Sequence, residues 1–198
     1  MDEQQPISWQ FIVLVILIAL MVLLVAAAPI PIERAPRPVS FNDLELSQRY
    51  DSPEGLSLDY PADWRIIPVE SGYFMLSNYA ATPGEPPASP NAVVIHFLRA
   101  PLEDFGLPGD TTAQDILFQM VSRSGRREEA ITEQPFGDLT GVRAHFLEQS
   151  LEKERVLLTP DERTLILIEA DVPQGRWEQV RGLFDRILET VTISEAAG

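Results

Sequence analysis

Residues 142–170, VRAHFLEQSLEKERVLLTPDERTLILIEA, decide the fold, because they contain three apolar segments separated by turn residues. The segments are residues 142–148, 156–159 and 164–170, with turns at Ser150 and around Pro160. Short apolar segments at this spacing predict β-strands that follow one another as an antiparallel meander. We therefore expect a mainly antiparallel sheet.

Further strands are expected on the N-terminal side of this meander. Residues 92–99, AVVIHFLR, are apolar on both faces, which is typical of a central strand. Two more strands are predicted by residues 73–76 and by the alternation of Leu56, Leu58 and Tyr60. Between these segments, the prolines of residues 80–91, AATPGEPPASPN, predict a surface loop.

Two helices complete the predicted fold. Thr111 or Thr112 can cap a helix that runs through Ser122, and Thr111 followed by Gln114 resembles a capping box. Near the C-terminal end, apolar residues recur every three or four positions, as on the buried face of an amphipathic helix: Trp177, Val180, Phe184, Ile187 and Val191. Strands and helices in this order predict an α+β fold.

Residues 11–28, FIVLVILIALMVLLVAAA, form an uncharged apolar run. As a helix this run would extend about 27 Å, which is close to the thickness of one bilayer core. A cleaved signal peptide is the alternative, but residues 1–10 contain no basic side chain and Pro29 follows the Ala-x-Ala site. We therefore expect the run to be retained as a transmembrane signal anchor that binds the chain to the membrane bilayer.

The chain is expected to continue from this anchor through a spacer to one domain. Four prolines in residues 29–42 predict an extended spacer. The expected order is a short tail, the transmembrane helix, a proline-rich linker, an α+β domain and a second tail, at residues 1–10, 11–28, 29–47, 48–193 and 194–198.

The charge and the cysteine content each argue against certain partners or sites. The formal net charge is −15, and such an acidic surface repels the phosphates of nucleic acid, so no nucleic-acid partner is expected. The chain has no cysteine, which excludes disulfides and thiolate metal sites.

Residues 50–64, YDSPEGLSLDYPADW, resemble the opening of PsbP-like (photosystem II extrinsic subunit P-like) domains, where a strand leads through Tyr-Pro to a turn and a tryptophan. The strand that starts at Gly141 and the final helix with Trp177 also fit this family. The resemblance spans about residues 48–193 and implies an α-β-α sandwich around an antiparallel sheet. It also implies an accessory protein, secreted or membrane-tethered, that docks on a larger assembly.

No catalytic residue, metal site or cofactor is predicted, because the motifs of common hydrolase, nucleotide and zinc sites are missing. The chain has two histidines. His96 is expected to be a structural residue of its strand, whereas His145 alternates with Ala144 and Phe146 and is expected to point outward. Adjacent carboxylates are expected to lie in solvated turns rather than to bind a cation: Glu103-Asp104, Glu128-Glu129 and Asp161-Glu162.

Arg123, Arg126 and Arg127 form a basic cluster after the first predicted helix. A structural explanation is that the helix dipole favours cations near a helix C-terminus. The functional alternative is that these arginines contact a carboxylate-rich partner or a lipid headgroup. They are therefore the candidate partner-contact residues of the sequence.

Taken together, these features favour a non-catalytic, membrane-tethered accessory module that docks on or stabilises a partner protein. The alternative is a small-ligand receptor or carrier, which requires a pocket between sheet and helix on which aromatics such as Tyr73, Tyr79 or Phe105 converge. A filled core would favour docking instead. A hydrolase or metal enzyme would require His96 or His145 to meet a carboxylate in a cleft.

Two observations disagree on which side of the membrane the domain lies. Arg34 and Arg37 follow the anchor, and by the positive-inside rule they favour a cytoplasmic domain. The family resemblance implies an extracytoplasmic domain, which is the orientation that we expect.

Protease added to intact cells should therefore degrade the domain, because it would lie outside the cytoplasmic membrane. Immunoblotting for the C-terminal domain, before and after permeabilisation, measures this. A cytoplasmic protein serves as the control and should resist until permeabilisation. If the domain resists together with that control, Arg34 and Arg37 set the orientation.

Overall fold

The computed structural model describes residues 40–87, 89–105, 111–124, 126–127, 131–136, 139–161 and 163–194. Within these ranges, no helix is long and apolar enough to cross a membrane. The predicted anchor at residues 11–28 lies outside the described residues, as do linker residues 29–39 and residues 195–198 of the predicted C-terminal tail.

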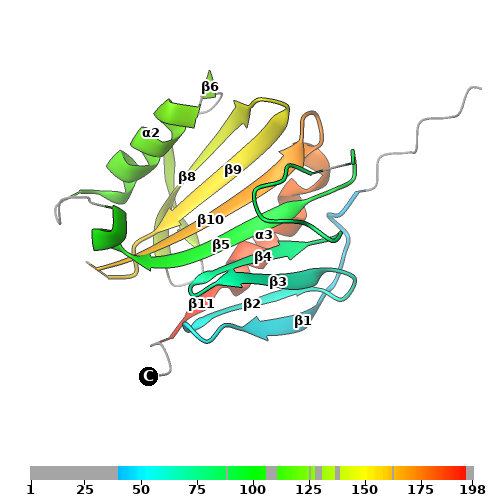
Figure 1. Cartoon of the computed structure of the whole chain (residues 1–198), viewed down its shortest axis with the longest axis horizontal. Helices are drawn as coiled ribbons and strands as arrows, with labels where there is room; N and C mark the ends of the chain where they lie inside the picture. Colours follow the sequence, from blue (N-terminus) through cyan, green and yellow to red (C-terminus); the bar gives the residue numbers. More distant parts are fainter. Residues whose placement is uncertain are drawn as a thin grey trace, which may run out of the picture. The chain divides into compact units, whose positions relative to one another are not determined.

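Within the described residues, the larger sheet has eight strands, and all their pairings are antiparallel (Figure 1). Across the sheet, the order is β3 (Arg65–Glu70), β4 (Tyr73–Ser77), β5 (Val94–Pro101), β10 (Thr164–Pro173), β9 (Leu151–Leu158) and β8 (Leu139–Glu148). Two short strands pair with the outer edge of β8: β6 (Arg126–Arg127) and β7 (Thr132–Phe136). The prediction of a mainly antiparallel sheet is confirmed.

The predicted meander is formed by β8, β9 and β10, and β5 lies between β4 and β10 as a strand with two neighbours. Strand β9 is longer than predicted, because it begins at Leu151 rather than at Val156. Residues 151–155, LEKER, lack an apolar run, yet they pair with both β8 and β10. Acidic residues of β10 stand opposite the basic residues of β9, so a charged segment can continue the strand.

A second sheet has three strands in the part of the chain that the structure describes: β1 (Leu46–Asp51), β2 (Leu56–Pro61) and β11 (Thr192–Ile193). The predicted alternation in β2 is confirmed, because Leu56 and Leu58 are buried and Tyr60 packs against the same core. Strand β11 pairs with the start of β2. Segments from the two ends of the domain therefore meet in this sheet.

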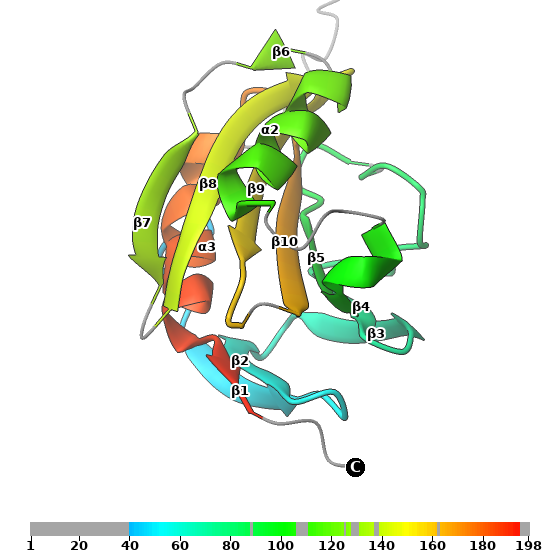
Figure 2. The same cartoon turned by 90° about the vertical axis from the view of Figure 1, so that its left-hand side faces the viewer.

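Two α-helices lie on opposite faces of the larger sheet, α2 (Ala113–Ser124) and α3 (Arg181–Thr190) (Figure 2). A short 3₁₀ helix comes before each of them, η1 (Leu102–Phe105) and η2 (Trp177–Gln179). The buried core on the α3 side contains residues of both sheets, whereas the core on the α2 side is smaller and lies over β8 and parts of β9 and β10. The predicted α+β fold is confirmed.

The predicted apolar stripe of the C-terminal helix is buried, with exposures between 0% and 6%: Trp177, Val180, Phe184, Ile187 and Val191. The α-helix itself begins later than the stripe, at Arg181, because Trp177 lies in η2. Glu152 on β9 holds this turn: its Oε2 accepts hydrogen bonds from the backbone nitrogens of Arg176 at 3.1 Å and Trp177 at 2.7 Å. The carboxylate thereby satisfies donors that the start of a helix leaves unpaired.

The segment before β1 packs against the domain. Phe41 is buried in the α3-side core, and its ring meets Trp64 edge to face with 5.9 Å between ring centroids. Asn42 Oδ1 accepts a hydrogen bond of 3.0 Å from the backbone nitrogen of Gly182 in α3. Part of the predicted linker, residues 40–47, is therefore packed on the folded domain.

Helix α2 is capped by Thr112. Its Oγ1 accepts a hydrogen bond from the backbone nitrogen of Asp115 at 3.1 Å and donates one to Asp115 Oδ2 at 2.7 Å. The sequence left Thr111 and Thr112 open and favoured the pair Thr111 and Gln114. That pairing was wrong by one residue: the helix begins at Ala113, so Thr112 is the residue directly before it and takes the N-cap position.

Replacing Thr112 by Ala should lower the free energy of unfolding by about 1 kcal/mol, because the first turn of α2 loses its side-chain cap. Urea denaturation of the full chain measures this change. The matched control is Thr111→Ala, which removes the same atoms one residue earlier and should have a smaller effect. Equal losses for the two variants would contradict the observed cap.

Candidate functional site

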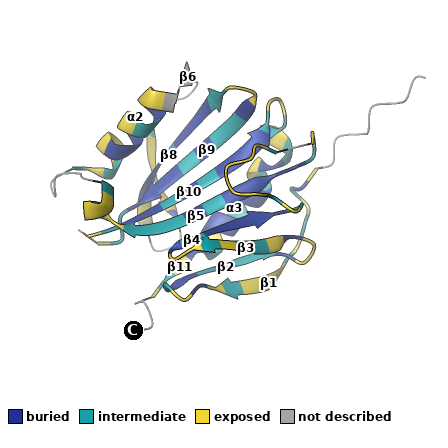
Figure 3. Ribbon diagram, viewed as in Figure 1, coloured by how far each residue is buried: buried dark blue, intermediate teal, exposed yellow. Residues whose placement is uncertain are grey.

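Helix α2 covers only one end of its face of the larger sheet. Its buried side chains, together with those under it, are Ile116, Leu117, Val121, Val142, Ala144, Phe146, Leu157 and Leu165. In the middle of β5, β9 and β10, at residues 95–98, 153–156 and 167–170, buried residues alternate with half-buried ones (Figure 3). Beyond α2, this face of the sheet and the neighbouring loops surround a hollow of about 500 Å³. It is lined by Tyr73, Gly84, Glu85, Pro86, His96, Leu98, Glu148, Gln149, Leu151, Lys153, Arg155, Leu167, Glu169 and Asp171. We refer to it as the polar hollow.

Strand register places opposite charges side by side in the polar hollow. Lys153 of β9 stands directly opposite Asp171 of β10, and Arg155 stands opposite Glu169. Residues two apart on a strand point to the same face. Two basic side chains on β9 therefore face two acidic ones on β10.

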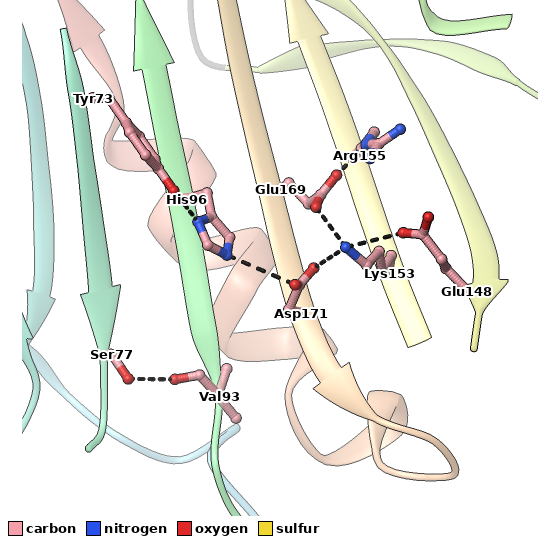
Figure 4. Close-up of polar contacts among 9 residues, drawn as sticks. All are labelled: Tyr73, Ser77, Val93, His96, Glu148, Lys153, Arg155, Glu169 and Asp171. Carbon is pink, nitrogen blue, oxygen red and sulfur yellow. Dashed lines mark hydrogen bonds and ion pairs between the residues drawn. The ribbon is translucent and has the colours of Figure 1, made fainter. Parts of the chain in front are cut away.

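Lys153 is the centre of this charge network. Its Nζ lies 2.9 Å from Glu169 Oε1, 3.1 Å from Asp171 Oδ1 and 3.1 Å from Glu148 Oε2 (Figure 4). Its side chain is only 12% exposed. Burial by itself lowers the pKa of Lys153, but the charges of Glu169 and Asp171 outweigh burial, so its pKa lies above the ordinary value. The ammonium group therefore stays charged.

His96 joins this network to β4. Its Nδ1 lies 2.9 Å from the Tyr73 hydroxyl oxygen, and its Nε2 lies 3.7 Å from Asp171 Oδ2 (Figure 4). Burial, together with nearby carboxylates, raises the pKa of Tyr73. The hydroxyl therefore keeps its proton and can donate a hydrogen bond to Nδ1.

Asp171 remains ionised although it is buried. Burial alone would raise its pKa, but the contacts with His96 and Lys153 hold the pKa below the ordinary value. Arg155 pairs with Glu169 and also lies over the Phe146 ring, 5.0 Å from the ring centroid. This cation–π contact connects the polar hollow to the apolar core under α2.

The loop between β4 and β5 borders the polar hollow. Its base is held by Asn78, whose Nδ2 donates to Asn91 O at 2.7 Å and whose Oδ1 accepts from Val93 N at 2.9 Å. At its tip, Gly84, Glu85 and Pro86 line the hollow. The proline-rich segment that the sequence assigns to a surface loop is thus one wall of the site.

His145 does not point outward as predicted: it is 8% exposed and lies on the α3 side of the sheet. Its Nδ1 lies 3.1 Å from Glu154 Oε2, and its ring is 5.4 Å from that of Trp177. The predicted alternation with Ala144 and Phe146 holds. The inference failed because helices cover both faces of β8, so each side of this strand is buried.

Arg123 is exposed in the last turn of α2, and Arg126 and Arg127 pair through β6 with Leu147 and Phe146 of β8. Their contact with a partner stays a prediction.

The structure describes some of the adjacent carboxylates that the sequence assigns to solvated turns. Asp161 Oδ1 accepts hydrogen bonds of 2.7 Å from the backbone nitrogens of Arg163 and Thr164, so this carboxylate closes a turn. Glu103 and Asp104 are exposed in η1, whereas residues 128, 129 and 162 lie outside the described residues. No group of three or more histidine or acidic side chains stands in position to hold a metal within the described ranges.

Sequence reasoning missed the charged residues of the polar hollow. Two signals could have found them. Lys153 is the single lysine beside fourteen arginines in the whole chain. Moreover, Glu169 and Asp171 place two charges on one face at the end of an otherwise apolar strand. An ammonium group can be shared among carboxylates around it, whereas a planar guanidinium favours one bidentate partner.

Comparisons with known proteins find similar folds. No protein-family model matches the chain, and no curated protein matches it. The solved structures that are similar include cyanobacterial PsbP from Synechocystis sp. PCC 6803, with 15% identity over 74% of this chain and 92% of that protein, at a TM-score of 0.46. LpqN of Mycobacterium tuberculosis, described as involved in cell envelope biogenesis, has 15% identity over 74% of this chain and 91% of LpqN, at a TM-score of 0.48.

A Bacteroides thetaiotaomicron protein is similar at 14% identity and a TM-score of 0.47, over 78% of this chain, which spans about half (51%) of that protein. These similarities concern the fold and carry no information on function. One of these structures is a PsbP, the family that residues 50–64 resemble.

Replacing Lys153 by Met should lower the free energy of unfolding by about 3 kcal/mol, because its three carboxylates would stay partly buried without a cation. Lys153→Arg should also be destabilising, since a guanidinium does not fit this three-way contact. Folding raises the pKa of Lys153, so its contribution is complete below about pH 10 and is lost only as the pH rises through the folded-state value. The loss should therefore be constant between about pH 6 and 9.

Urea denaturation at several pH values measures this loss. The control is Arg181→Met, which removes an exposed cation from α3 and should change stability by less than about 0.5 kcal/mol. A loss at Lys153 as small as that at Arg181 would show that the ion pairs contribute little.

Proposed function

We propose that this chain is a non-catalytic accessory module, tethered to a membrane by residues 11–28, and that it docks on a partner protein through the polar hollow. The observation that carries this proposal is the ion-paired surface of β9 and β10, which neither α2 nor α3 covers. The side chains of Lys153, Glu169 and Asp171 are only 11–13% exposed, yet they lie on an open face of the sheet. Charged groups that are already oriented contribute more to the specificity of docking than to its affinity.

The edges of the larger sheet support docking on its face. Pro68 lies in edge strand β3, and Pro135 lies in β7 on the outer side of β8. Proline has no backbone N–H and interrupts the row of donors that an added strand would need. A partner strand is therefore disfavoured along these edges, and the open face remains for a partner.

The core supports docking over the carrier that we considered from the sequence. The space between the sheet and α3 is filled by a continuous buried core. A carrier would require three aromatics to converge on one pocket. Of these, Tyr73 lines the polar hollow, Phe105 packs against the core under α2, and the Tyr79 hydroxyl is buried. A carrier remains the second candidate because the hollow has the volume of a small-molecule site.

The contact of His96 with Asp171 is the arrangement that an enzyme would require. Both imidazole nitrogens are engaged, however, with Tyr73 on one side and Asp171 on the other. The raised pKa of Tyr73 also disfavours a tyrosinate nucleophile. A non-catalytic role therefore fits this site better than proton transfer to a substrate.

We propose that the chain is a single-pass membrane protein whose domain is extracytoplasmic. Arg34 and Arg37 favour the alternative, a cytoplasmic domain. A short proline-rich linker would hold the domain near the bilayer. Tethering of this kind raises the effective concentration toward neighbouring membrane proteins, so weak docking becomes sufficient.

A photo-crosslinking amino acid at Leu98, inside the polar hollow, tests the proposal in intact cells that produce the full chain. We expect one discrete protein adduct, which should weaken when Glu148 at the rim is replaced by Arg. The matched control is the same amino acid at Glu178, which is exposed in η2, on the opposite side of the sheet.

Identical adducts from Leu98 and Glu178, or none from Leu98, would contradict docking at this face. An adduct whose mass increases by less than about 1 kDa, on the scale of a drug-sized ligand, would favour the carrier instead.

A further inference from the structure

We propose that the polar hollow accepts one positively charged side chain of the partner, an ammonium or guanidinium group on an aliphatic stem. This inference rests on the proposed docking function and names the chemistry of the group that enters. Three properties of the polar hollow support it: its charge balance, an incompletely bonded buried carboxylate and its apolar walls.

The charge balance of the lining favours a cation. Four carboxylates and two cations line the hollow, so its formal charge is −2 when His96 is neutral. Both cations, Lys153 and Arg155, already contact carboxylates. An entering anion would meet a net negative site in a chain of net charge −15, whereas a cation would be attracted.

Asp171 has hydrogen-bonding capacity that its described neighbours do not use. The residue is 8% exposed, and within the described part of the chain its Oδ1 has one donor, the Lys153 ammonium at 3.1 Å. A carboxylate oxygen can accept a second donor. Buried carboxylate oxygens are normally hydrogen-bonded, so an N–H donor that entered the hollow would complete this site.

The walls suit the stem of such a side chain. Leu98, Leu151 and Leu167 line the hollow from β5, β9 and β10, and Pro86 lines it from the loop. Long basic side chains bury their methylene groups along apolar surface while the charge contacts polar groups. A single basic side chain therefore matches both the apolar walls and the acidic centre.

The two histidines provide the measurement, because His96 lines the polar hollow and His145 is buried on the opposite face of the sheet. The full chain, labelled with ¹⁵N at histidine, is held in nonionic detergent micelles and titrated with butylguanidinium chloride. We expect a saturable shift of the His96 signal in the millimolar range, while the His145 signal stays constant. Butyrate and butanol, at the same ionic strength, should leave His96 unchanged.

Two variants and a control separate local binding from the field of the whole domain. Asp171→Asn should weaken butylguanidinium binding about tenfold, because a charged hydrogen-bond acceptor is lost. Glu148→Gln, at the more exposed rim, should weaken it less and provides the test if Asp171→Asn fails to fold. The control, Glu189→Gln at an exposed position of α3, removes the same charge and should leave binding unchanged.

The inference is overturned if butylguanidinium causes no saturable shift of His96, if butyrate causes the same shift, or if Glu189→Gln weakens binding as much as Glu148→Gln. A protein adduct from Leu98 without a cation response would leave docking standing and remove only this inference. A cation response without any protein adduct would overturn docking, and with it the assignment of the cation to a partner's side chain.

Discussion

One ammonium group links three strands of the sheet. Lys153 of β9 reaches Glu148 at the end of β8 and Glu169 and Asp171 on β10. Because these carboxylates are largely buried, none of them can lose the cation without a large desolvation cost. The same contact therefore supports both the register of β8, β9 and β10 and the shape of the polar hollow. It is made by the single lysine of the chain.

The two faces of the larger sheet are covered to different extents. On the α3 side, apolar residues from both sheets, η2 and the segment around Phe41 fill the space, and Glu152 closes the start of η2. On the other side, α2 covers only the part near β8. An antiparallel sheet can face water on one side when that side is polar. Here the uncovered part is polar, and its charges pair with one another.

The two histidines show how position in the sheet determines the role of a side chain. Both lie on strands, and both contact a carboxylate, Asp171 for His96 and Glu154 for His145. His145 lies between β8 and η2, where Trp177 covers it, and it packs η2 against the larger sheet. His96 lies in an open hollow beside Tyr73, so the same residue type takes part in a surface.

The sequence alone determined the parts of this protein that follow from local periodicity. The alternation in residues 142–170, the apolar residues 92–99 and the stripe from Trp177 to Val191 predicted strands and a helix that the structure contains, because strand and helix periods are properties of short segments. Only the tertiary structure decided the polar hollow, since its residues come from β4, β5, β8, β9, β10 and a loop, and their contacts depend on strand register. It also decided the burial of His145, because alternation assigns a side chain to a face but cannot tell whether a second layer covers that face.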